Sequence, residues 1–230
     1  MTKIHGLQKT TLLDWPGKVA CTVFLGGCDF RCPFCHNSAL ITGNMPEAIS
    51  EDEFIRFLSK RKGLLDGVCL TGGEPLLRSD LAEFLNRIKD MGYPIKLDTN
   101  GNHPKQLADL CKKGLIDYVA MDIKNCPERY AETVGVAELD LSLIQESVEW
   151  LLSGQVEYEF RTTIVRQFHD SESIVQIGQW IHSAKRYYLQ GFVNSKEVLA
   201  SGLEAYSKKE MEQFLRLVRA YLPAAELRGV

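Results

Sequence analysis

Two kinds of hydrophobic pattern alternate along this whole chain, and this alternation limits how it can fold. Short apolar runs rich in β-branched or aromatic residues predict strands, and stretches with apolar residues at helical spacing lie between them. The predicted strands are 19–25, 67–71, 95–98, 118–122, 157–165 and 187–190. Helical spacing occurs over 81–88, 144–152, 174–181 and 211–222. Because a helix between successive strands makes the strands parallel, the sequence predicts an α/β fold.

The polar residues at the strand ends indicate the shape of the sheet. Six β/α units are too few for a complete eight-stranded barrel, which leaves a partial (β/α)6 TIM-like barrel with parallel strands or a doubly wound sheet. The C-terminal strand ends, which form the active face of such barrels, carry Gly72, Gly73, Glu74, Asp98, Thr99, Asn100, Asp122, Lys124 and Gln190. This distribution favours the partial barrel.

The composition predicts one globular domain. The chain has 230 residues, 45% of them hydrophobic, which is enough to bury a single core. We expect one domain over 1–230, with an extension over 1–18, the six units over 19–190, and a loop and helix over 191–230. A net charge of -3 gives no basic field for nucleic acid, and no segment approaches the roughly 20 apolar residues of a membrane span. We expect a cytoplasmic protein that binds neither nucleic acid nor a membrane.

Three cysteines, Cys28, Cys32 and Cys35, lie within eight residues directly after the first predicted strand. A reducing cytosol keeps thiols free, and soft thiolates select zinc, copper(I) or iron–sulfur clusters. Structural zinc usually needs a second ligand pair, and the sequence has no second CxxC. A cubane cluster takes four cysteines, so three would leave one iron open to another ligand. A zinc site and three buried, unreactive thiols remain the alternatives.

Two further groups of residues on the active face are candidates for ligand contact. The segment Thr71-Gly72-Gly73-Glu74-Pro75 combines a carboxylate with glycines whose backbone a ligand can approach, although a tight strand-to-helix turn would explain it too. Arg161 and Gln190 complete the ring of polar strand ends, and an ion pair with an aspartate explains Arg161 equally well. Cys21, Cys69 and Cys111 are expected to be core thiols that take no part. Cys126 follows the active-face residues 122–125, so it either approaches the cluster or is a bystander, and the second interpretation is favoured.

The chain resembles the radical S-adenosylmethionine superfamily. The pattern Cys-x3-Cys-x2-Cys, with Phe34 before the last cysteine, occurs together with the intact GGEP segment. Over nearly its whole length it also resembles the activating enzymes of glycyl radical enzymes, above all those of anaerobic ribonucleoside-triphosphate reductase. The segments that carry this likeness are 7–10, 14–17, 35–37, 97–101, 120–124 and 159–163. Trp15 stands where the pyruvate formate-lyase activase has glycine, which leaves the partner's identity open.

The resemblance implies a cofactor set and a reaction. A [4Fe-4S] cluster on the three clustered cysteines would reductively cleave S-adenosylmethionine to a 5'-deoxyadenosyl radical, which would take hydrogen from a glycine of a partner protein. The residues expected at the cofactors are Phe34, Gly72, Gly73, Glu74, Asp98, Thr99, Asp122 and Lys124. Asp98 and Thr99 are also expected to hold a monovalent cation, and Asp14 to touch the partner's loop.

The expected partners are a glycyl radical enzyme, namely anaerobic ribonucleotide reductase, and flavodoxin or ferredoxin as the electron donor. Two other functions remain open at this point. One is a radical enzyme acting on a small molecule, similar to 7-carboxy-7-deazaguanine synthase. The other is a non-enzymatic iron–sulfur or zinc module, in which the thiols serve electron transfer or structure.

Overall fold

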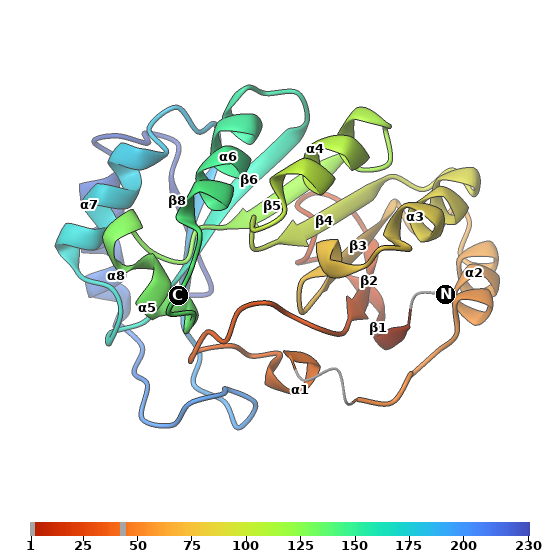
Figure 1. Ribbon diagram of the computed structural model, residues 1–230, viewed down its shortest axis with the longest axis horizontal. Helices are drawn as coiled ribbons and strands as arrows, with labels where there is room; N and C mark the ends of the chain where they lie inside the picture. Colours follow the sequence, from red (N-terminus) through yellow and green to blue (C-terminus); the bar gives the residue numbers. More distant parts are fainter. Residues whose placement is uncertain (1–2, 42–44) are drawn as a thin grey trace.

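The computed structural model describes residues 3–41 and 45–230, and its eight strands form one sheet in the order β1 to β8 (Figure 1). The strands are β1 (Ile4–Thr11), β2 (Ala20–Leu25), β3 (Gly67–Gly72), β4 (Ile95–Thr99), β5 (Tyr118–Asp122), β6 (Glu157–Ile164), β7 (Tyr187–Gly191) and β8 (Glu226–Arg228). The six predicted strands match β2 to β7 to within about one residue at either end. Every pair from β2 to β8 is parallel, so the α/β class is confirmed.

The two edge strands were not predicted, and one of them runs against the others. β1 lies in the predicted extension over 1–18 and pairs antiparallel with β2, so the expectation of an all-parallel sheet is wrong at this edge. The short connection over 12–19 holds no crossover helix, and a direct connection of this kind joins antiparallel neighbours. β8 pairs with β7 over three residues only, too few for a periodic signal.

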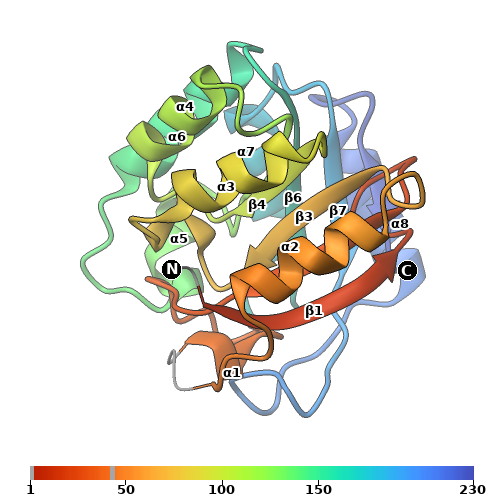
Figure 2. The same ribbon diagram turned by 90° about the vertical axis from the view of Figure 1, so that its right-hand side faces the viewer.

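Helices cover the outer face of the sheet (Figures 1 and 2). The helices of the described residues are α1 (Ser38–Ile41), α2 (Glu51–Lys60), α3 (Leu81–Asp90), α4 (Pro104–Lys112), α5 (Tyr130–Val134), α6 (Leu141–Leu152), α7 (Ser171–Trp180) and α8 (Lys208–Val218). The short α1 lies apart from this layer, at the bottom of Figure 1. α2 and α8 begin with capping boxes at Ser50 and Ser207, each stabilising its helix by about 1 kcal/mol. Within 3–41 and 45–230, no helix is both long and apolar enough to cross a bilayer.

The strands present apolar side chains to the helices and polar ones to the concave side of the sheet. Side chains alternate between the two faces of a strand. On β2 and β3, Val23, Leu25 and Leu70 join the main core under the helices. Ala20 and Cys69 point the other way, where Trp15 packs on them in a small separate cluster. The rest of the concave side is largely charged, and it leads to the C-terminal strand ends.

Candidate active site

The loop over 26–37, here called the cluster loop, carries the three clustered cysteines and is held by segments distant in sequence. The Gly27 carbonyl accepts a hydrogen bond from the backbone N–H of Glu74 at 2.8 Å, and the Arg31 N–H donates to the Val134 carbonyl at 2.8 Å. The backbone N–H of Ala200 donates to the Pro33 carbonyl at 2.8 Å. The loop therefore has a fixed path over the C-terminal ends of the strands.

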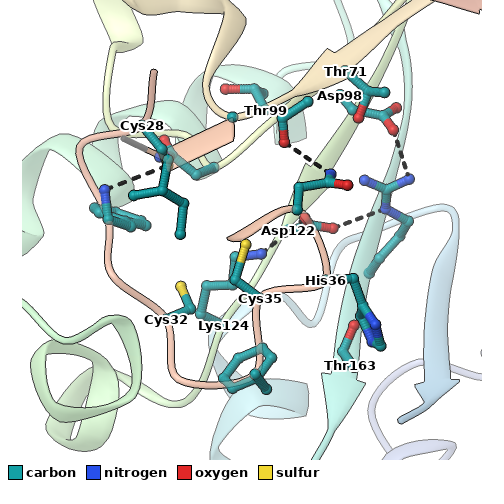
Figure 3. A pocket seen from close by; sticks show the side chains of 18 residues that line it. Cys28, Cys32, Cys35, His36, Thr71, Asp98, Thr99, Asp122, Lys124 and Thr163 are labelled. Carbon is teal, nitrogen blue, oxygen red and sulfur yellow. Dashed lines mark hydrogen bonds and ion pairs between the residues drawn. The ribbon is translucent and has the colours of Figure 1, made fainter. Parts of the chain in front are cut away.

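One pocket brings most of the predicted site residues together (Figure 3). The predicted residues that line it are Cys28, Cys32, Phe34, Cys35, Gly72, Gly73, Asp98, Thr99, Asp122, Lys124 and Arg161. The other lining residues are Phe30, His36, Asn37, Ile41, Thr71, Asn100 and Thr163. Thr71 and Asn100 were already expected on the active face, and Thr163 lies two residues after Arg161 on the same face of its strand. The other lining residues of the cluster loop could not be predicted, because no local sequence pattern encodes the path of that loop.

The three thiols are free, and burial raises the pKa of Cys28 to about 12 and that of Cys32 to about 11. Metal loading must therefore release their protons. Phe34 fixes the last turn of the loop by packing on Phe168, with ring centroids 5.7 Å apart. In the part of the chain that the structure describes, no three His, Cys, Asp or Glu side chains converge as a single-ion site. A cubane binds each thiolate through a different iron, so three separated thiols in one pocket fit a cluster better than tetrahedral zinc.

A chain of alternating charges forms one wall of the pocket. Arg161 lies at its centre, with Nε 2.8 Å from Asp122 Oδ1 and Nη1 3.2 Å from Asp98 Oδ2. Lys124 Nζ lies 2.9 Å from Asp122 Oδ2, and Lys96 pairs with Asp98. Burial alone would raise the pKa of Asp122, but Arg161 and Lys124 outweigh it and hold this pKa well below its ordinary range. Burial also acts to raise the pKa of Asp98, but Arg161 and Lys96 hold this pKa below its ordinary value. Both carboxylates are therefore ionised.

This arrangement bears on two predictions. The ion pairs with Asp98 and Asp122 explain the position of Arg161 without a ligand, which was the alternative to ligand contact. The Arg161 side chain also lines the pocket. A monovalent cation at Asp98 would have to compete with Lys96 and Arg161 for the same carboxylate. The cation site remains a prediction that the geometry weighs against.

The two glycines of the GGEP segment are required by the close approach of neighbouring backbone, which is the cluster loop at Gly73 and the end of β2 at Gly72. A Cβ on Gly73 would lie 2.0 Å from the Gly27 carbonyl oxygen. Gly72 has φ of +122°, and its Cβ would lie 2.3 Å from the Leu25 carbonyl oxygen. A larger residue at Gly73 would displace the loop that carries the cysteines, and one at Gly72 would clash with the end of β2.

Glu74 lies behind the pocket wall. Its side chain is fully buried, and it accepts hydrogen bonds from the Leu76 N–H, the Thr99 hydroxyl and the Asn100 N–H at 3.0, 2.9 and 2.7 Å. Burial raises its pKa to about 7. The expected contact between Glu74 and a ligand remains a prediction. In this structure its carboxylate braces the end of β3 against that of β4.

Asp14 and Gln190 do not line the pocket. Asp14 lies in the connection between β1 and β2, at the N-terminal end of β2, and accepts a hydrogen bond from the Thr22 hydroxyl at 2.5 Å. Cys28 follows the opposite end of that strand. Gln190 lies on β7 beside Thr163 of β6. Their predicted contacts with the partner and with the cofactor remain predictions.

Fold and site together define a class: a partial-barrel α/β enzyme whose thiol-rich loop and polar pocket lie at the C-terminal mouth of the sheet. The sequence profile of the Radical SAM superfamily matches residues 22–175. The chain is 33% identical to the "Putative glycyl-radical enzyme activating enzyme MJ1227" of Methanocaldococcus jannaschii, over 82% of this chain and 79% of that protein. The chain belongs to the radical SAM superfamily, within the family of glycyl-radical enzyme activating enzymes.

Three further comparisons include one relative of the same family, one enzyme with a different activity and one solved structure. A pyruvate formate-lyase-activating enzyme of Clostridium pasteurianum is 28% identical over 96% of this chain and 92% of its own length. A 7-carboxy-7-deazaguanine synthase of Koribacter versatilis is 29% identical over 63% of this chain and 61% of that protein. The crystal structure of Streptococcus suis SuiB bound to S-adenosylmethionine has a TM-score of 0.70 at 15% identity, covering 88% of this chain and 48% of that one. That likeness shows the fold alone.

The family implies a [4Fe-4S] cluster and S-adenosylmethionine as cofactors. The chemistry of the donor set fits them, because three thiols of one fixed loop face a pocket that also offers bare glycine backbone and paired charges. Cys28, Cys32 and Cys35 would hold the cluster. The glycine pair and the charged wall would face the nucleotide.

Proposed function

We propose that this enzyme activates an anaerobic ribonucleotide reductase by removing a hydrogen atom from a glycine of that protein. The observation that carries the proposal is the pocket in which three cysteine thiols meet the glycine pair and the Arg161 ion pairs. When bound, the cluster and S-adenosylmethionine supply the 5'-deoxyadenosyl radical. The chain's own residues orient these cofactors and exclude water from them.

The open sheet supports a protein substrate. β1 and β8 are the two edges of the sheet, and among the residues that the structure covers these edges are not paired with each other. The sheet is therefore not closed between them, and we propose that an extended loop of a partner protein enters from that flank. Asp14, beside the β1 edge, is the residue we assign to contact with that loop. Flavodoxin or ferredoxin is the proposed electron donor.

The test uses purified partners and electron paramagnetic resonance. The reconstituted enzyme is mixed anaerobically with S-adenosylmethionine, a reductant, and either anaerobic ribonucleotide reductase or pyruvate formate-lyase. We expect a glycyl radical signal on the reductase that disappears with Cys32→Ala. The matched control is Cys111→Ala, because Cys111 lies on α4 and does not line the pocket. A signal on pyruvate formate-lyase alone would refute the proposed partner and leave the activase family unaffected.

A small-molecule substrate is the second candidate, since a deazaguanine synthase is among the relatives. The two candidates differ in the substrate whose presence increases the cleavage of S-adenosylmethionine to 5'-deoxyadenosine. With a protein substrate, 5'-deoxyadenosine forms in proportion to glycyl radical. A purine-like substrate that increases 5'-deoxyadenosine formation while no tested protein gains a radical would favour the second candidate.

A further inference from the structure

Asp29, the residue directly after Cys28, has its carboxylate surrounded by donors from a different part of the chain. Asn100 Nδ2 donates to Asp29 Oδ1 at 2.7 Å, and Asn102 Nδ2 donates to Oδ2 at 2.6 Å. His103 Nε2 lies 3.0 Å from Oδ2. All three donors follow β4, about 70 residues away in sequence, so the carboxylate joins the cluster loop to the β4–α4 connection.

The side-chain amides of Asn100 and Asn102 are oriented with their nitrogen atoms toward Asp29. Asn100 Oδ1 accepts the backbone N–H of Asn102 at 2.9 Å, which fixes the Asn100 amide with its Nδ2 toward the carboxylate. Asn102 Oδ1 is buried and has no hydrogen-bond partner among the residues placed by the structure. Leaving such an acceptor unsatisfied is unfavourable. The Asn102 amide therefore donates to Asp29 although its own Oδ1 is left without a hydrogen bond.

The same connection also holds the glycine-rich segment. The backbone N–H of Asn100 donates to Glu74 Oε2, and the N–H of Glu74 donates to the Gly27 carbonyl in the cluster loop at 2.8 Å. A closed ring of contacts results, from Asp29 through Asn100 and Glu74 back to Gly27. Cluster loop, glycine pair and β4 end are thereby linked as one unit.

We propose that Asp29 is a positioning residue that sets the distance between the cysteine ligands and the S-adenosylmethionine pocket. It acts through Asn100 and Asn102, and its Oδ1 also lies 4.0 Å from the Sγ of the neighbouring Cys28. The three cysteines suffice to assemble the cluster, whereas the nucleotide must reach the open iron and the glycine pair at once. Loss of Asp29 should therefore weaken nucleotide binding while the cluster still forms. The inference rests on the radical SAM chemistry of the family and is independent of the proposed partner.

The experiment compares Asp29→Ala with Asp109→Asn, an exposed position on α4, and with the double variant Asp29→Asn/Asn102→Asp. The double variant exchanges carboxylate and amide, so the introduced amide can donate to the introduced carboxylate and still accept from Asn100. Iron and sulfide content, the dissociation constant for S-adenosylmethionine, and the spectrum of the reduced cluster with and without the nucleotide are measured. No partner protein is present, so the outcome is separate from the test of partner identity.

For Asp29→Ala we expect unchanged iron content, binding of S-adenosylmethionine weakened about tenfold or more, and a smaller change of the cluster spectrum on nucleotide addition. The exchange variant should regain most of the affinity, and Asp109→Asn should match the parent. Unchanged affinity and spectrum in Asp29→Ala would overturn the proposal, as would loss of the cluster itself. If Asp29→Ala fails to fold, the exchange variant decides: a folded variant with parental affinity supports the inference, and one with weak binding overturns it.

Discussion

Replacement of Arg161 by methionine should destabilise the protein because it removes the centre of the charged wall. The Arg161 side chain is 13% exposed and makes charge-assisted contacts with Asp122 at 2.8 Å and with Asp98 at 3.2 Å. Such a hydrogen bond contributes about 1.5 to 3 kcal/mol, so two give an upper range of roughly 3 to 6 kcal/mol. Each aspartate keeps one lysine, Lys96 or Lys124, which places the expected loss near the lower end, about 3 kcal/mol.

The assay is urea unfolding of the metal-free chain, with Arg186→Met as the matched control. Arg186 pairs with Glu157 at 2.7 Å, but the two side chains are 41% and 59% exposed, so this pair should contribute less than about 1 kcal/mol. The double variant Arg161→Met/Asp122→Asn should lose less than the sum of the two single losses, since the second change removes a carboxylate that has lost a partner.

Two results would refute this reasoning. One is a loss for Arg161→Met no larger than that for Arg186→Met, which would mean that the buried pairs contribute no more than an exposed one. The other is strict additivity in the double variant, which would mean that Arg161 and Asp122 are not coupled. Either result would favour the interpretation of Arg161 as a ligand contact over that of a stabilising ion pair.

Two further predictions concern stability. Arg228→Ala should cost about 3 kcal/mol and increase hydrogen exchange in β8, because Arg228 holds the fully buried Glu159 through contacts at 2.7 and 2.9 Å; protection of β8 equal to that of the parent would contradict this. Burial lowers the pKa of His169 to about 4, below the unfolded value near 6.5. The unfolded chain therefore binds the proton first, so stability is complete above about pH 6.5 and falls by up to roughly 3 kcal/mol as the pH drops toward 4. His169→Gln should flatten this part of the unfolding profile, whereas His182→Gln, at an exposed position, should leave it unchanged; an equally steep profile in both variants would exclude His169 as its source.

Local patterns were enough to predict much of this protein. The central strands are recognisable as short apolar runs, since most of their residues are buried whichever face of the sheet they lie on. The spacing of the three cysteines and the paired glycines identified the loop and the turn that form the pocket. Because parallel strands end at the same edge of a sheet, polar residues at those ends could be expected to meet, and most of them do.

Other features depended on the tertiary structure. β8 has three residues and no periodicity, so only its pairing with β7 and the Arg228 contact define it. The GGEP pattern could not show that Glu74 is buried and braces β4, and the position of Asp14 in the sequence could not show that its carboxylate accepts the Thr22 hydroxyl.

Asp29 illustrates the difference most clearly. The sequence showed that it follows the first of the three clustered cysteines and indicated nothing about its carboxylate. Its three donors follow β4, and they reach it only because β2, β3 and β4 lie side by side with their C-terminal ends at one edge. The sequence alone determined the chemical groups and the strands that carry them. Which groups contact one another was decided by the folded sheet, because contacts between distant segments depend on strand order and register, which local periodicity does not encode.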